Sequence, residues 1–213
     1  MATAATQAPI VVGPADDGRR VSADEYFRIE VQPGYRCELA RGALEVSQIP
    51  DEIHALLVCF FYDALSVYRH AHLGRIYLYG GANEFHFWLP GMSSGRNPDV
   101  AVSLHGAPLD LEGKRLASLV VEVVSPGKPT RKRDYVTKRE EYLTYGIDEY
   151  WIVDRFARTV TILRRDDHSW IERIYGDGES AESTVLPEFA VPLAELWAAI
   201  VDVPDYGAEI PGA

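Results

Sequence analysis

The stretch Leu119-Val-Val-Glu-Val-Val-Ser125 (LVVEVVS) has the composition of a strand buried in the middle of a β-sheet. Leucine and valine suit such a strand, but the carboxylate of Glu122 is costly to bury unless another group pairs with it. The stretch therefore predicts a central strand and, at Glu122, a partner that another part of the chain must supply.

The residues that follow the stretch predict a crossover between two parallel strands. A helix is expected at residues 131–145, ending at Gly146, which suits a C-cap, and an apolar strand is expected at residues 149–154. Strand, helix and strand in this order indicate a βαβ unit. We therefore expect an α/β protein with a mixed β-sheet core flanked by helices.

Hydrophobic periodicity and turn residues indicate the remaining elements. A long amphipathic helix is predicted at residues 50–71, with acidic residues in its first turn. A short helix is predicted at residues 22–31, because Ser22 and Glu25 have the spacing of a capping box. Further strands are expected at residues 35–39, 43–47, 75–79, 84–89, 100–104, 159–164 and 169–175, and a closing helix at residues 193–201.

Length and composition indicate a single globular domain. The chain has 213 residues, of which 47% are hydrophobic and 25% charged. We expect one domain at residues 21–202, a flexible tail at residues 1–20 and a C-terminal tail at residues 203–213. No signal-peptide pattern opens the sequence and no apolar run is long enough to span a membrane. With Cys37 and Cys59 expected as reduced core thiols, a cytoplasmic protein is predicted.

A second acidic residue comes directly before a neighbouring strand. If the strand at residues 100–104 pairs antiparallel with LVVEVVS, Asp99 lies roughly opposite Glu122. Two neighbouring carboxylates repel each other, and a divalent cation removes that repulsion. Mg²⁺ typically binds one or two carboxylates together with waters and phosphate oxygens. Asp99 and Glu122 are therefore candidate ligands of Mg²⁺ or Mn²⁺.

The helix at residues 131–145 brings a basic residue toward the same place. Asp134, Lys138 and Tyr142 are four residues apart, so they share one ridge of the helix. The ammonium of Lys138 could orient a water, lower its pKa or offset charge in a transition state. A structural interpretation stays open for each residue: a salt bridge with Lys138 or an arginine for Glu122, a solvated helix position beside Tyr142 for Lys138, a first-turn cap or charge for Asp134, and packing for Tyr142.

The net charge of −11 argues against a protein that coats nucleic acid without specificity. The segment from Gly127 to Arg139 is nevertheless basic, with a net charge of +5. Cations at a helix N-terminus oppose the helix dipole, whereas an anion there would meet both the cations and free N–H groups. We therefore expect phosphate to be bound by Lys128, Arg131, Lys132 and Arg133.

Several short motifs occur in a fixed order along the chain. The main ones are Asn97-Pro-Asp99, Val121-Glu-Val-Val-Ser-Pro126, Asp134-x-x-x-Lys138-x-x-x-Tyr142 and Gly146-Ile-Asp-Glu-Tyr-Trp-Ile-Val-Asp154. Together they resemble the Uma-two family of restriction-endonuclease-like domains, within the PD-(D/E)xK nuclease superfamily. The similarity also includes residues 37–42 (CELARG), His54, Leu186-Pro187 and residues 192–197 (PLAELW), so it extends over residues 22–200.

This resemblance implies a restriction-endonuclease-like core, here with additional N-terminal and C-terminal β-hairpins, and Mg²⁺-dependent cleavage of DNA by a metal-activated water. It makes Asp99 and Glu122 the metal-binding acids and Lys138 the catalytic lysine. The strict superfamily pattern would place that lysine at position 124, which is Val124 here. Further site candidates are Glu38, Asp134, Tyr142 and His54.

Two other functions stay open from the residues alone. One is a non-catalytic nucleic-acid-binding module of the same fold, against which the acid–acid–lysine set counts. The other is a metallo-phosphoesterase acting on small nucleotides, which the sequence disfavours because it has no Gly-rich phosphate loop. The expected partners are DNA and a second copy of the chain, since enzymes that cut both strands often pair two active sites. No association with a membrane is expected.

Overall fold

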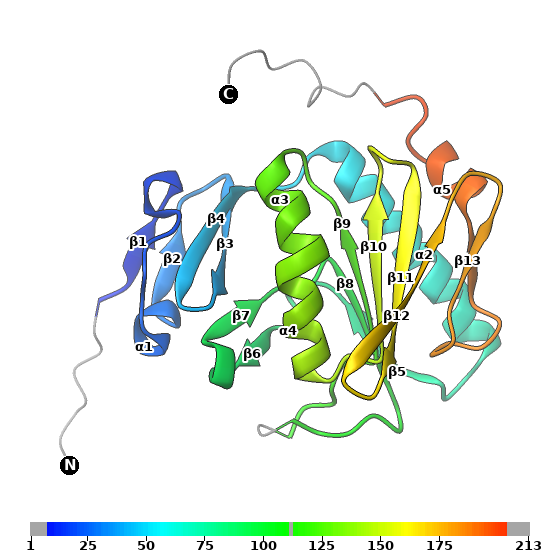
Figure 1. Ribbon diagram of the computed structural model, residues 1–213, viewed down its shortest axis with the longest axis horizontal. Helices are drawn as coiled ribbons and strands as arrows, with labels where there is room; N and C mark the ends of the chain where they lie inside the picture. The colour runs from blue at the N-terminus through cyan, green and yellow to red at the C-terminus, as the bar shows by residue number, and fades with distance from the viewer. Residues whose placement is uncertain (1–7, 111–112, 204–213) are drawn as a thin grey trace. The chain divides into compact units, whose positions relative to one another are not determined.

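The computed structural model describes residues 8–110 and 113–203 of the chain (Figure 1). The fold consists of two compact units, Met1–Ile49 with Phe87–Arg96 and Pro50–His86 with Asn97–Ala213. Within the predicted N-terminal tail, residues 1–7 lie outside the described residues, whereas β1 (Ile10–Val12) and the 3-10 turn Pro14–Asp16 are formed. The predicted C-terminal tail lies outside the described residues except for its first residue.

The first unit begins with a parallel pair of short strands joined by a helix. In α1 (Ala23–Tyr26) the predicted capping box is present: Ser22 Oγ accepts from Glu25 N–H and the Glu25 carboxylate accepts from Ser22 N–H. The helix is shorter than predicted, because the β-branched residues that follow form β2 (Ile29–Val31), which pairs with β1.

The same unit contains a four-stranded sheet in the order β4-β3-β7-β6. The strands predicted at residues 35–39 and 43–47 are confirmed as β3 (Tyr35–Ala40) and β4 (Ala43–Gln48), which form an antiparallel hairpin. The strand predicted at residues 84–89 is present but shorter, as β6 (Phe87–Leu89). It forms a hairpin with β7 (Ser94–Arg96), a strand that was not predicted. A hydrophobic cluster of this unit consists of Val12, Tyr26, Cys37, Leu39 and Leu44.

The second unit is built on a six-stranded mixed sheet, as expected. Its order is β12-β11-β10-β9-β8-β5, in which β9 and β10 are parallel and the other neighbours antiparallel. The predicted βαβ crossover is therefore confirmed. The strands are β5 (Ile76–Gly80), β8 (Val100–Leu104), β9 (Leu119–Val123), β10 (Glu149–Asp154), β11 (Thr159–Asp166) and β12 (Ser169–Tyr175).

Helices cover both faces of this sheet (Figure 1). The long helix α2 (Glu52–Ala71) packs on one face, where the Phe61 and Trp151 rings are perpendicular with their centroids 6.0 Å apart. The crossover on the other face comprises α3 (Lys128–Lys132), the π-helical turn η3 (Arg133–Thr137) and α4 (Lys138–Tyr145). The helix ends at Gly146, whose φ of +108° is a conformation that favours glycine.

Two small elements complete the second unit. The strands β13 (Ser180–Glu182) and β14 (Ala190–Pro192) form an antiparallel pair, and α5 (Leu193–Ala198) follows them. Neither this helix nor any other in the described part of the chain is both long and apolar enough to cross a membrane. Of the two free cysteines Cys37 is buried, but Cys59 is exposed, so its assignment as a core thiol was wrong.

Replacing a core leucine of α2 tests this packing. Leu65 is fully buried, whereas Val67 on the same helix is 72% exposed. We expect Leu65→Ala to lower the free energy of unfolding by about 2–5 kcal/mol, because it removes buried methyl groups and leaves a cavity. The control Val67→Ala should change it by less than about 0.5 kcal/mol. Urea denaturation measures both, and equal losses would contradict the assigned inner face of α2.

Candidate active site

Asp99 and Glu122 lie at the same end of two neighbouring strands. The predicted antiparallel pairing of β8 with β9 is confirmed, and Val100 is opposite Val121. Extending this register by one residue puts Asp99 opposite Glu122. The Val123 N–H donates to Asp99 Oδ2 at 2.9 Å, so the Asp99 side chain extends along β9 at this position.

Glu122 is buried together with two partners from α4. Because side chains alternate along β9, Val121 and Val123 join the core under α2 while Glu122 faces the helix on the other side. Lys138 Nζ lies 2.8 Å from Glu122 Oε1, and the Tyr142 hydroxyl donates to the same oxygen. All three residues are at most 1% exposed. The carboxylate that is out of place in an apolar strand is therefore paired.

Asp134 lies one turn before Lys138, in the π-helical turn. Its Oδ1 accepts from Arg133 Nε at 2.9 Å, while its buried Oδ2 has no hydrogen-bond partner among the described residues. Burial raises the pKa of Asp134, the charges of Arg133 and Lys138 oppose this, and the nearby Asp99 carboxylate raises it further. Asp134 therefore lies within electrostatic range of both Asp99 and Lys138. π-Helical turns in α-helices are frequent at functional sites.

His54, a further candidate, reaches Asp99 from the first turn of α2. Its Nε2 lies 3.1 Å from Asp99 Oδ1, and both side chains are 5% exposed. The N-cap residue of the helix, Asp51, accepts from the His54 N–H at 2.8 Å. The structure thus brings together five of the predicted residues with His54: Asp99, Glu122, Asp134, Lys138 and Tyr142.

Glu38 belongs to the other unit, on β3, where it is buried. Arg96 Nη1 lies 3.3 Å from Glu38 Oε2 and also contacts the Glu45 carboxylate. The Arg96 guanidinium is fully buried between these acids. The structure therefore gives Glu38 a charged partner within its own unit, and its part in the site stays a prediction.

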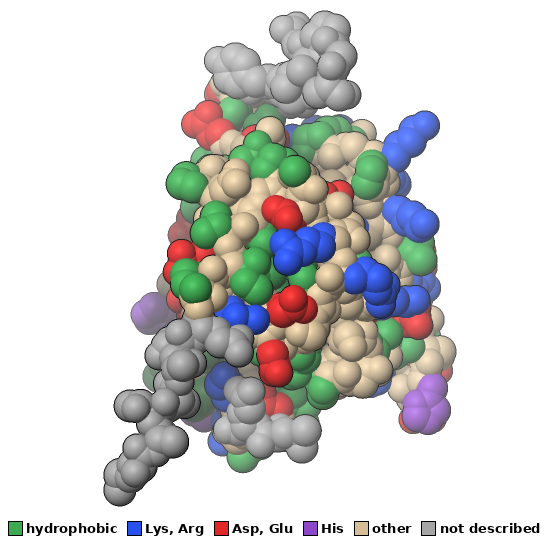
Figure 2. Space-filling view, turned by 90° about the vertical axis from the view of Figure 1, so that its left-hand side faces the viewer, with side chains coloured by type: hydrophobic (Ala, Val, Ile, Leu, Met, Phe, Trp, Pro, Cys, Tyr) green, Lys and Arg blue, Asp and Glu red, His purple; other side chains and the backbone are tan. Residues whose placement is uncertain are grey.

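The four cations expected to bind phosphate differ in their surroundings. Lys128 and Lys132 are exposed at α3. Arg131 forms an ion pair with Asp154 and lies over the Tyr135 ring, 4.6 Å from its centroid. Arg133 is buried and pairs with Asp134. Figure 2 shows both Lys or Arg and Asp or Glu side chains on the face that it draws.

The donor set at the end of β8 and β9 fits a hard divalent cation. The described residues contain no group of three or more His, Cys, Asp or Glu side chains placed to hold a metal ion. Mg²⁺ needs only one or two carboxylates, however, because waters and phosphate oxygens complete its coordination. Asp99 and Glu122 supply such a pair on adjacent strands, and the unpartnered Oδ2 of Asp134 is a further oxygen donor. Mg²⁺ or Mn²⁺ would be held by Asp99 and Glu122.

Sequence reasoning missed an arginine and an aspartate at the end of β10. Asp154 is fully buried and accepts from Tyr135 Oη at 3.2 Å and from the Phe156 and Ala157 N–H groups, in addition to Arg131. Arg155 is 8% exposed and donates to both carboxylate oxygens of Asp51. In the sequence, these two residues stand out only as an oppositely charged pair at the end of an apolar strand, which does not identify the groups that they bind.

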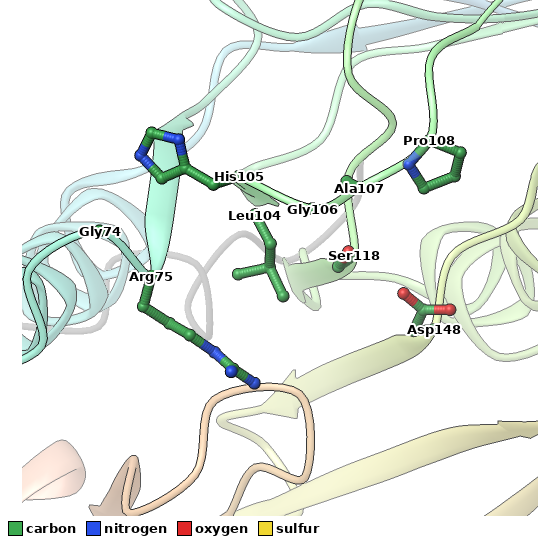
Figure 3. A pocket seen from close by; sticks show the side chains of 9 residues that line it. All are labelled: Gly74, Arg75, Leu104, His105, Gly106, Ala107, Pro108, Ser118 and Asp148. Atoms are coloured by element: carbon green, nitrogen blue, oxygen red, sulfur yellow. The ribbon is translucent and has the colours of Figure 1, made fainter.

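A pocket of about 410 Å³ lies at the opposite end of β8 and contains none of the predicted site residues (Figure 3). Arg75, His105, Ser118 and Asp148 are its polar side chains. The Arg75 guanidinium donates to the Val185 carbonyl at 3.0 Å. Burial raises the pKa of Asp148, although a hydrogen bond with Ser118 and the charge of Arg165 counteract this. Both charged groups thus have protein partners.

Comparisons with known proteins agree with this architecture. A solved structure described as a putative nuclease belonging to DUF820, from Anabaena variabilis, matches with a TM-score of 0.64 and 15% sequence identity, covering 85% of this chain and 99% of that one. At this identity the likeness shows the fold. No curated protein matches the chain. The family model Uma2, described as "Putative restriction endonuclease", matches residues 23–194. The chain therefore belongs to the Uma2 family, the Uma-two family that its motifs resemble.

Proposed function

We propose that this protein is a metal-dependent DNA endonuclease that hydrolyses phosphodiester bonds with a metal-activated water. Family membership supports a nuclease. The observation that carries the finer proposal is the contact of Lys138 with Glu122 at 2.8 Å, beside the strand that presents Asp99. Two acids and a lysine from three separate elements lie at one end of the sheet, and a divalent cation held there could polarise a phosphate oxygen and activate a water.

The protein groups have separable roles in this proposal. A divalent cation bound by Asp99 and Glu122 would polarise the scissile phosphate and lower the pKa of a water. His54 Nε2 and the Val123 N–H each hold one oxygen of Asp99, and the Tyr142 hydroxyl orients Glu122. The Lys138 ammonium orients the attacking water or offsets charge on the phosphate. By family resemblance, the products carry a 5′-phosphate and a 3′-hydroxyl.

Flanking phosphates are assigned to the exposed lysines of α3. Lys128 and Lys132 lie at the start of the crossover helix, where N–H groups also favour anions. Arg131 and Arg133 were expected to share this role, but Arg131 pairs with Asp154 of β10, which suits it to holding the helix in place, and the buried Arg133 pairs with the neighbouring Asp134. The predicted homodimer and the cytoplasmic location stay predictions.

The non-catalytic alternative has one observation in its favour. Lys138 and Tyr142 both bind Glu122 Oε1, so the acid is neutralised by protein groups alone. In a decayed nuclease the same contacts would be a structural salt bridge. Titration calorimetry with Mn²⁺ separates the two, because the binding module should give no metal-dependent heat. Comparing hydrolysis of a model phosphodiester and a DNA duplex tests the small-nucleotide phosphoesterase.

Conservative variants at the three central residues test the activity. We expect Asp99→Asn, Glu122→Gln and Lys138→Met each to slow nicking of supercoiled plasmid in Mg²⁺ or Mn²⁺ by about 10²–10³-fold or more, because each removes a charge from the reacting centre. Gel assays of purified protein measure the rates. Glu140→Gln, on the exposed side of α4, should cut like wild type.

The buried pair requires an additional control. Removing one partner of a buried ion pair costs about 3–5 kcal/mol, so a single variant can lose activity by unfolding. The double variant Glu122→Gln/Lys138→Met leaves no unpaired charge and should be folded but inactive. Cleavage at the wild-type rate by all variants would reject the proposed site, since the activity would then come from elsewhere.

The exposed lysines should affect DNA affinity rather than chemistry. We expect Lys128→Ala and Lys132→Ala each to raise KM with kcat unchanged, and to reduce the slope of log affinity against log salt by about 1 for each phosphate that is no longer neutralised. Fluorescence anisotropy with a labelled duplex measures the slope. Lys114→Ala, an exposed lysine before β9, is the matched control. If the slope of log affinity against log salt is unchanged in both α3 variants, these lysines do not bind DNA phosphates.

A further inference from the structure

Arg155 makes a contact that helix capping alone does not require. Its Nη1 donates to Asp51 Oδ1 at 2.7 Å and its Nη2 donates to Oδ2. Asp51 is the N-cap residue of α2, a role that needs only one side-chain oxygen. The Arg155 side chain is 4% exposed, and burying a guanidinium is costly unless its geometry is tightly fixed. This bidentate contact fixes the start of α2 against the end of β10.

The same carboxylate also fixes the first turn of the helix. Asp51 Oδ1 accepts from the His54 N–H at 2.8 Å as well as from Arg155. Burial alone would raise the pKa of Asp51, but hydrogen bonds from Arg155 and the His54 N–H outweigh it and lower the pKa. Asp51 is therefore ionised at neutral pH and binds both groups at once.

His54 extends this chain of contacts to the candidate active site. Its Nε2 lies 3.1 Å from Asp99 Oδ1. Imidazoles at metal sites usually have their other ring nitrogen held by a carboxylate or carbonyl, which orients the ring. Here the buried Nδ1 has no hydrogen-bond partner among the described residues. The backbone of the first turn, held by Asp51, is thus the part of the chain that sets the position of the ring.

We infer that Arg155 is a positioning residue of the candidate site: acting through Asp51 and His54, it fixes the carboxylate of Asp99 beside Glu122. The contacts run from the end of β10 to the start of α2 and then to the start of β8, three elements far apart in the sequence. What Asp99 does in that position rests on the proposed function, but the contacts themselves do not.

Two variants weaken the Arg155–Asp51 contact without removing the helix cap. Arg155→Lys keeps the positive charge but loses the planar fork. Asp51→Asn keeps an N-cap residue as favourable as aspartate but loses the charge that Arg155 needs. Arg164→Lys is the control, because Arg164 also approaches a buried carboxylate, that of Glu149 at 3.6 Å, but at the opposite end of β10.

Three measurements report on Asp99. The first is kcat and KM for plasmid cleavage, and the second is the Mn²⁺ dissociation constant from calorimetry. The third is hydrogen exchange of the Val123 amide, which donates to Asp99 Oδ2 and so reports on this carboxylate without metal or substrate. The exchange rate of the Val123 amide is divided by that of the β10 amides in the same sample, which corrects it for any change in global stability.

We expect Arg155→Lys and Asp51→Asn to lower kcat about 10-fold with KM within about 2-fold, and to weaken Mn²⁺ binding about 10-fold, as for outer groups that orient metal ligands. The Val123 amide should exchange several-fold faster relative to β10. In a His54→Ala background, Arg155→Lys should add less than about 2-fold, because the path to Asp99 is already broken.

Equal changes in Arg164→Lys, or a full effect of Arg155→Lys in the His54→Ala background, would overturn the inference, since the contact would then only stabilise the fold. If Arg155→Lys does not fold, Asp51→Asn carries the test. A wild-type protein that neither cleaves DNA nor binds Mn²⁺ rejects the proposed function. The Val123 amide still decides whether Arg155 positions Asp99 in that case.

Discussion

The contact of Lys138 and Tyr142 with Glu122 is the constraint on which the second unit depends. A carboxylate in the central strand of a sheet is tolerated only with a cation and hydrogen-bond donors beside it. Both come from one ridge of α4, so this contact fixes the helix against β9 in one register. The adjacent Asp99 and the crossover before Gly146 then occupy the positions that this register allows.

Much of the second unit could be predicted because its signals are local and strong. The amphipathic pattern of α2, the apolar runs of β9 and β10 and the glycine after α4 each correspond to one element. The short strands of the first unit were harder. β7 consists of Ser94, Gly95 and Arg96, residues of low strand propensity that tertiary pairing holds in place.

The site was predictable where it lies on regular elements. Register arithmetic along β8 and β9 placed Asp99 opposite Glu122, and the i, i+4 spacing placed Lys138 and Tyr142 together. Arg155 was not found, because its relation to Asp51 spans 104 positions and no periodicity joins them. Likewise no pattern separates Arg131 from the exposed lysines beside it, since its partner Asp154 is 23 positions away and is brought near only by folding.

The π-helical turn at Arg133–Thr137 is the place in the crossover where the chain length can change by one residue. A π-helical turn holds one residue more than an α-helical turn, whereas each residue of a regular α-helix rotates the chain by about 100°. Removing one residue within the turn would therefore leave a regular helix with Lys138 and Tyr142 still on the side that faces Glu122, but removing one residue between Lys138 and Tyr142 would rotate one of them away. Asp134 would be the residue displaced in the first case, because it lies in the turn itself.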